Sequence, residues 1–138
     1  MMFLKMINIG YNIIDKFKFT QEDVNIFSVL TKDNNPIHLD EEYAKNTIFK
    51  KPIIHGFLGG SVFSKLLATK LWGSGTIYLK QNLKFCKPMY PLTEYTAYLE
   101  VTDIDYEKHR AKILTQIKQE ENLVIDGDAL IQNKNIQK

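Results

Sequence analysis

The sequence predicts an α+β protein in which a curved antiparallel sheet wraps around one long central helix. Three observations support this prediction. A first strand is followed by residues with helical spacing, the helical part ends in a segment that is apolar almost all round, and the remainder alternates between apolar and polar residues. Helices followed by a run of strands favour a sheet covered by helices on one face.

The first elements are a strand over residues 11–19 and a helix that opens at Thr20. Thr20 is a good N-cap, and Asp23 stands three residues on, where it complements the positive end of the helix dipole. This helix should end just before Asp33. A second short helix begins where Asp40 can cap it.

The central helix is predicted to begin at His55-Gly56 and to continue through Leu67 to residue 71. Four strands follow the Gly73-Ser74-Gly75 turn, over residues 77–85, 95–102, 111–118 and 125–131. We expect the strand over 77–85 to be half-buried and the three later strands to form a meander. The last seven residues are expected to be frayed.

Composition predicts a single domain over residues 1–138. The hydrophobic share is 44%, the charged share is 25%, and the formal charge of +2 is spread without a basic stripe, so nucleic acid is not an expected partner. Cys86 is the one cysteine, so an internal disulfide is excluded. The sequence has no Cys/His cluster, so a structural zinc site is not expected. Residues 1–9 resemble neither a signal peptide nor a membrane span, so a soluble, cytoplasmic protein is expected.

The stretch from Asp33 to His38 is the candidate catalytic segment. Pro36 prevents regular helix there, and Asn34 and Asn35 tolerate turn geometry, so the carboxylate and the imidazole can face one small volume. Such a pair can move a proton to and from water at neutral pH. The alternative is structural: Asp33 caps a turn, and His38 is a partly buried histidine.

Gly56 is the candidate binding residue for a substrate oxygen. The first turn of a helix leaves backbone N–H groups without partners, and a residue without a side chain lets a ligand oxygen reach them. The alternative is that the glycines at 56, 59 and 60 only permit close packing.

Two motifs are similar to those of the MaoC-like hydratases, specifically the (R)-specific enoyl-CoA hydratases of the hot-dog fold. The first runs from Phe27 through Asp33-Asn34-Asn35-Pro36-Ile37-His38 to Ala44, and the second is Pro52-Ile53-Ile54-His55-Gly56. The resemblance extends over roughly residues 19–131. The chain departs from the family pattern at Trp72, at the turn over residues 91–94, and at Lys32, where the general signature prefers glycine.

The resemblance implies a role for each matching residue. Asp33 and His38 would hold and activate a water molecule, Gly56 N–H would bind the thioester oxygen, and Ser64 would support the active-site carboxylate, with Asn35 as a further supporting residue. Leu67 lies one helical turn beyond Ser64 and either lines the acyl pocket or packs in the core. We expect a structural role for His55, which precedes Gly56.

The function implied is reversible addition of water to a trans-2-enoyl-CoA, giving an (R)-3-hydroxyacyl-CoA. This chemistry requires no metal and no organic cofactor, and the resemblance implies a homodimer. Three alternatives stay open: a 3-hydroxyacyl-ACP dehydratase, an acyl-CoA thioesterase, and a non-catalytic acyl-CoA-binding module.

Overall fold

A five-stranded antiparallel sheet forms the body of the protein in the computed structural model, which describes residues 6–138. The strands are β1 (Asn12–Phe17), β2 (Ile77–Phe85), β3 (Tyr95–Asp105), β4 (Arg110–Gln119) and β5 (Asn122–Gln132). Their order across the sheet is β1-β3-β4-β5-β2, so β3, β4 and β5 form the predicted meander. Residues 1–5, part of the N-terminal segment considered above, lie outside the described residues.

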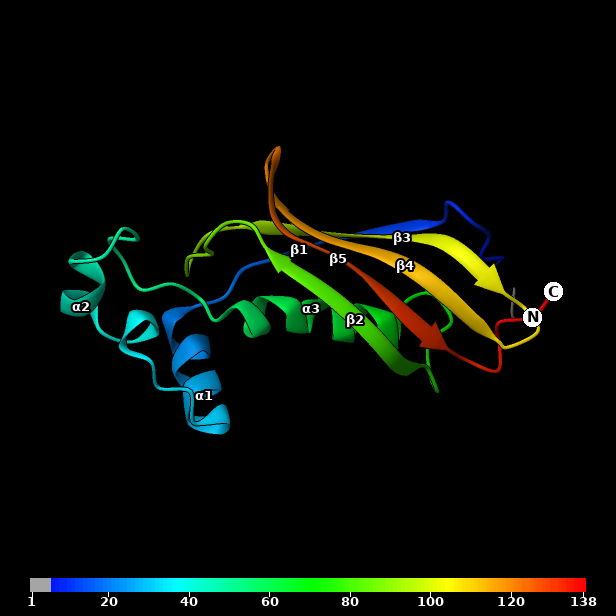
Figure 1. The fold of residues 1–138 in the computed structure, drawn as a ribbon, viewed down its shortest axis with the longest axis horizontal. Helices are drawn as coiled ribbons and strands as arrows, with labels where there is room; N and C mark the ends of the chain where they lie inside the picture. Colours follow the sequence, from blue (N-terminus) through cyan, green and yellow to red (C-terminus); the bar gives the residue numbers. More distant parts are fainter. Residues whose placement is uncertain (1–5) are drawn as a thin grey trace.

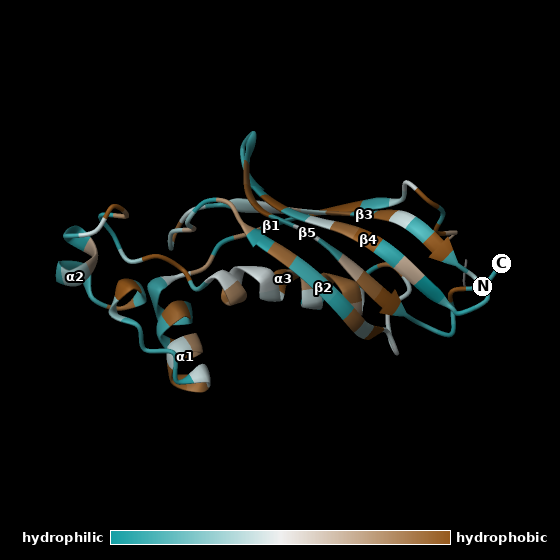
Figure 2. Ribbon diagram, viewed as in Figure 1, coloured by the Kyte–Doolittle hydropathy of each residue, from teal (hydrophilic) through white to brown (hydrophobic). Residues whose placement is uncertain are grey.

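The helix α3 (Gly56–Thr69) lies along one face of the curved sheet (Figure 1). Its buried residues are Leu58, Gly59, Val62, Phe63, Leu66 and Leu67. Along β3 and β4 hydrophobic and hydrophilic residues alternate (Figure 2), and the apolar members, such as Leu99 and Ile113, are fully buried. This arrangement confirms the predicted curved sheet around a central helix.

A short helical region projects beyond one end of the sheet (Figure 1). It contains α1 (Gln21–Thr31), the 3-10 turn η1 (Pro36–His38) and α2 (Glu41–Lys45). At the start of α1 a full capping box is present, in which Thr20 N–H donates to Asp23 Oδ2 at 2.8 Å and Asp23 N–H donates to Thr20 Oγ1 at 3.1 Å. No helix among the described residues is both long enough and apolar enough to cross a membrane.

Two predictions about the sheet and its end were wrong. The strand β2 is an exposed edge, not half-buried, because it lies last in the strand order and its register shifts between Tyr78 and Lys80, which breaks the expected alternation. The C-terminal residues are docked, not frayed. Asn133 donates to Thr76 Oγ1 at 2.9 Å, and Ile136 is fully buried while its carbonyl accepts from His109 Nδ1 at 2.8 Å.

At Gly127 the backbones of β5 and β2 leave no room for a side chain. A Cβ at this position would lie 2.0 Å from the backbone oxygen of Asn82, which cannot retreat without opening the β2–β5 pairing. Gly60 in α3 differs, because a Cβ there would meet only the Leu83 side chain at 3.2 Å.

The variant Gly127→Ala is therefore expected to lower the free energy of unfolding by about 1–3 kcal/mol, the usual cost of overpacking. Gly60→Ala is the matched control and should be neutral or stabilising, since alanine favours helix by up to about 1 kcal/mol over glycine. Thermal unfolding followed by circular dichroism measures both. Equal melting temperatures for Gly127→Ala and the unchanged protein would contradict the packing argument.

A second stability prediction concerns Lys32, which ends α1 with φ 64° and ψ 14°. This left-handed conformation costs a side-chain-bearing residue about 1 kcal/mol or more, and glycine adopts it freely. Lys32→Gly should therefore raise the free energy of unfolding by about 0.5–1 kcal/mol, after the greater freedom of glycine in the unfolded chain is counted. Lys112→Gly, an exposed position inside β4, should have the opposite effect in the same chemical denaturation experiment.

Candidate active site

The Asp33–His38 loop is shaped by hydrogen bonds made within it. The Asn35 side chain caps η1 by accepting from Ile37 N–H at 3.3 Å, and the Asn35 carbonyl accepts from His38 N–H at 3.1 Å. The Asn35 N–H donates to Asp33 Oδ1 at 3.4 Å. Asn35 therefore holds the aspartate and the histidine on one turn, as an Asx residue before a proline can do.

His38 is fixed to the body of the protein through one ring nitrogen. Its Nδ1 lies 2.8 Å from the carbonyl oxygen of Ile53, and because a carbonyl only accepts, Nδ1 carries the hydrogen. Gln21 Nε2 donates to the His38 carbonyl at 2.9 Å, and His38 is only 9% exposed. In the neutral ring Nε2 then has a free lone pair, which can accept a proton from water.

His55 packs against His38 and joins the start of α3 to α1 and to the Asp33–His38 loop. The two rings are stacked with centroids 3.8 Å apart and an interplanar angle of 27°. His55 Nε2 lies 3.0 Å from Ser28 Oγ and 3.3 Å from the backbone oxygen of Asp33, so its hydrogen faces both oxygens. The Phe27 ring covers His55 at a centroid distance of 4.7 Å.

Burial keeps the His55 ring neutral. The side chain is 3% exposed, and this desolvation lowers the pKa of His55 below 6.5, against a smaller opposing effect of the hydrogen bond to the Asp33 carbonyl. Its Nδ1 is buried and has no hydrogen-bond partner among the described residues. This geometry is consistent with the structural role expected for His55.

Asp33, His38 and His55 bring one ligand-type atom each within 4.8 Å of one another. Such a separation leaves room for a water molecule hydrogen-bonded between the exposed Asp33 carboxylate and an imidazole nitrogen. Among the described residues, these three also form the group whose side chains could hold a metal ion. Their geometry favours water, because His38 Nδ1 and His55 Nε2 are engaged in hydrogen bonds and the two rings stack instead of converging.

Gly56 and His38 line one cavity of about 430 Å³ at the start of α3. The hydrogen bonds of α3 begin with Leu58 N–H, which donates to the His55 carbonyl at 3.0 Å, so Gly56 N–H precedes the first turn. A Cβ on Gly56 would lie 2.7 Å from the Phe85 ring, so the glycine also permits packing. The remaining wall is mostly apolar and consists of Phe49, Ile53, Ile54, Phe57, Phe85, Cys86, Lys87, Pro88, Met89 and Ile125.

The structure thus brings Asp33, Asn35, His38 and Gly56 together, whereas two other predicted site residues lie elsewhere in the chain. Ser64 is on the exposed face of α3, and Leu67 is 1% exposed within the core and does not line the cavity with Gly56. Leu67 packs in the core, which was its alternative role.

Ser28 was not singled out from the sequence, although the structure gives it a place beside the site. It is 4% exposed and reaches the His55 ring from α1. Ser28 lies four residues after the buried Val24, so it shares the inward face of the helix. A polar residue on the inward face of a helix could have marked Ser28 as a candidate. Its contact with His55 could not be predicted, because the two residues are 27 positions apart in the sequence.

Comparison with known proteins gives consistent results over most of the chain. A family model described as MaoC like domain matches residues 4–123. An (R)-specific enoyl-CoA hydratase from Aeromonas caviae is 41% identical over 115 residues, which cover 83% of this chain and 86% of that protein. A mitochondrial 3-hydroxyacyl-[acyl-carrier-protein] dehydratase from Solanum lycopersicum is 36% identical, with 90% of this chain and 76% of that protein covered.

The fold also matches a solved structure. The (R)-hydratase from A. caviae involved in PHA biosynthesis superposes with a TM-score of 0.89 at 37% identity, covering 94% of this chain and 98% of the other. The hot-dog fold expected from the sequence is therefore confirmed. With the family model matching well over half of its length, the chain belongs to the MaoC-like domain family.

Proposed function

We propose that this protein is an (R)-specific enoyl-CoA hydratase, which adds water reversibly to a trans-2-enoyl-CoA to give an (R)-3-hydroxyacyl-CoA. The observation that carries the proposal is that His38 and Gly56 line one mostly apolar cavity, and that Asp33 lies beside His38. The likeness to the Aeromonas caviae hydratase supports the substrate class and the stereochemistry. The expected cytoplasmic location stays a prediction.

In the proposed reaction, one water molecule lies between Asp33 and His38. It donates one O–H to the Asp33 carboxylate and the other to His38 Nε2. The Nε2 lone pair is available because the ring hydrogen is on Nδ1, which donates to the Ile53 carbonyl. As the water oxygen attacks the β-carbon, Asp33 takes a proton. A proton then returns from the Asp33–His38 pair to the α-carbon.

Negative charge develops on the thioester oxygen when the β-carbon is attacked. We assign its stabilisation to Gly56 N–H and to the positive end of α3, which act more strongly on the enolate than on the neutral carbonyl. One such donor is worth on the order of 10²–10³ in rate. The apolar wall formed by residues such as Phe85 and Met89 would take the acyl chain.

A 3-hydroxyacyl-ACP dehydratase is the second candidate, favoured by the likeness to the Solanum lycopersicum protein. The chemistry at the β- and α-carbons would be the same in reverse. The difference lies in the carrier of the acyl group, so hydration of crotonyl-CoA compared with crotonyl-ACP distinguishes the two.

We predict that Asp33→Asn and His38→Asn each lower kcat for crotonyl-CoA hydration by on the order of 10²–10⁴, the usual contribution of a general acid or base. Asparagine at 38 can still donate from the Nδ1 position to Ile53, so the loop should keep its shape while Nε2 is lost. The measurement is the loss of enoyl absorbance, together with chiral analysis of the product.

Matched controls are Asp103→Asn and His109→Asn near the opposite end of the sheet, which should leave the rate unchanged; asparagine at 109 can still donate to the Ile136 carbonyl and tolerates the positive φ there. Release of free thiol without hydration would assign the protein to the thioesterases. Acyl-CoA binding with no turnover by the unchanged protein would make it a binding module.

We also propose that two copies pair through the edge strand β2. Ile77 and Leu79 are 52% and 41% exposed, and a long edge strand with exposed apolar residues is a site for pairing with another chain. Pairing β2 with its symmetry mate would continue the sheet across both protomers and cover these side chains.

The expected mass in light scattering is therefore about twice 16.1 kDa. Leu79→Lys should shift the protein to the monomer, because a lysine on the edge opposes strand pairing. Ile14→Lys on the other edge strand, β1, is the control, since Ile14 is 64% exposed and its substitution should leave the dimer intact. A stable monomer of the unchanged protein at micromolar concentration would refute the pairing.

A further inference from the structure

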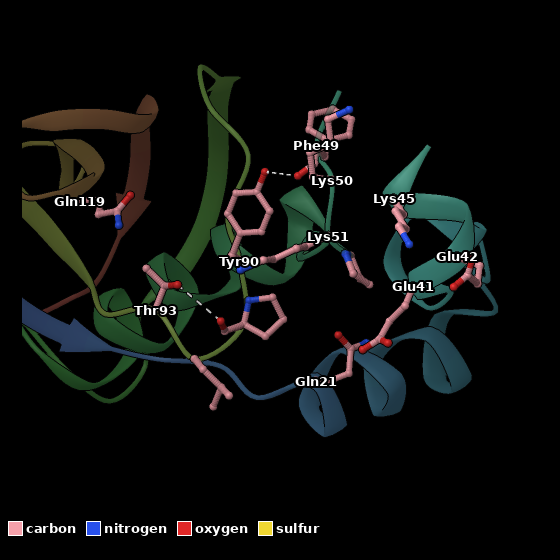
Figure 3. A pocket seen from close by; sticks show the side chains of 13 residues that line it. Gln21, Glu41, Glu42, Lys45, Phe49, Lys50, Lys51, Tyr90, Thr93 and Gln119 are labelled. Atoms are coloured by element: carbon pink, nitrogen blue, oxygen red, sulfur yellow. Dashed lines mark hydrogen bonds between the residues drawn. The ribbon is translucent and has the colours of Figure 1, made fainter. Parts of the chain in front are cut away.

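A second, larger cavity adjoins the candidate active site where the helical region projects from the sheet. Its volume is about 1090 Å³, and Phe49 lines both this cavity and the smaller one at Gly56. Phe49 is held in place by its carbonyl, which accepts from Tyr90 O–H at 2.9 Å (Figure 3). The two cavities are therefore neighbours across one fixed residue.

The wall of the larger cavity mixes polar and apolar residues and carries three lysines, Lys45, Lys50 and Lys51. All three are exposed, and neither of the two ion pairs found within residues 6–138 includes them. Two carboxylates, from Glu41 and Glu42, also line the cavity, so the lysines are in excess.

Two of these lysines approach the cavity from different segments. Figure 3 shows Lys51 reaching toward Tyr90, while Lys45 comes from α2 on the facing side. Tyr90 adds an aromatic ring to the wall, which offers a stacking surface for a planar group. Cationic side chains around an aromatic surface suit a phosphorylated nucleotide.

The chain between the lysines and Gly56 is short. Lys51 precedes Gly56 by five residues, so their Cα atoms are at most about 18 Å apart. The intervening residues are anchored, because Ile53 N–H donates to the Ile37 carbonyl at 3.1 Å and Ile54 N–H donates to the Met89 carbonyl at 2.8 Å. A pantetheine arm with its thioester at Gly56 is of comparable reach.

We infer that Lys45 and Lys51 form the subsite for the phosphorylated nucleotide end of CoA, with Lys50 at its rim and Tyr90 beside the base. This inference rests on the proposed hydratase function for the position of the thioester. It adds that the enzyme recognises its substrate by charge at the larger cavity and by apolar contact at the smaller one.

The test compares two crotonyl thioesters that differ only in the phosphorylated end, crotonyl-CoA and crotonyl-pantetheine. For Lys45→Ala/Lys51→Ala, KM for crotonyl-CoA should rise about tenfold or more, because charge-assisted contacts to phosphate are lost. Its kcat, and both constants for crotonyl-pantetheine, should stay unchanged. Lys45→Arg/Lys51→Arg should keep KM close to that of the unchanged protein. Raising the salt concentration should reduce the difference in KM for crotonyl-CoA between the unchanged protein and the double alanine variant.

The matched control is Lys108→Ala/Lys112→Ala, which removes two lysines near the β3–β4 turn at the opposite end of the sheet (Figure 1) and should leave KM unchanged. An equal rise in KM for both thioesters, or no rise for crotonyl-CoA, would overturn the subsite while leaving the hydratase proposal intact. If the unchanged protein hydrates neither thioester, the hydratase proposal fails. Calorimetric binding of free CoA then decides the subsite, which is supported if the double variant binds more weakly and refuted if both bind equally.

Discussion

The position of the candidate site depends on a short series of hydrogen bonds between three segments. Ile53 accepts from His38 Nδ1 and donates to the Ile37 carbonyl, and the next residue, Ile54, donates to the Met89 carbonyl. The helical region projects from the sheet, and these contacts, together with the His38–His55 stacking and the His55 contact with the Asp33 carbonyl, join the Asp33–His38 loop to the core. Without them the imidazole would not be held against the start of α3, because the loop contributes few buried apolar side chains.

The sequence was sufficient to predict the elements whose signals are local. Alternation located β3, β4 and β5, and the residues at Thr20 and Asp23 located the start of α1, because capping and strand faces involve neighbours in the chain. The exposure of β2 could not be predicted in this way. Its pattern suits a half-buried strand, and its place at the edge follows from strand order, which depends on pairing with the distant strand β5.

The same distinction applies to the candidate site. Pro36 and the spacing of Asp33 and His38 predicted a loop with an acid and an imidazole, and the structure has them on one turn. The partners that orient these groups come from distant segments: Ser28 from α1 and the Ile53 carbonyl from the segment before α3. The exposed position of Ser64 depends on which face of α3 meets the sheet, and this follows from tertiary packing.

The stacked histidines have different electrostatic roles because their surroundings differ. His55 is buried on all sides by Phe27, Ser28 and the loop, and its pKa is lowered mainly by desolvation, so the ring stays neutral at pH 7. Two cationic rings 3.8 Å apart would repel strongly, so a neutral His55 leaves His38 without a charged ring stacked against it. The pair therefore combines one buried, neutral histidine with one whose Nε2 we propose to contact the reacting water.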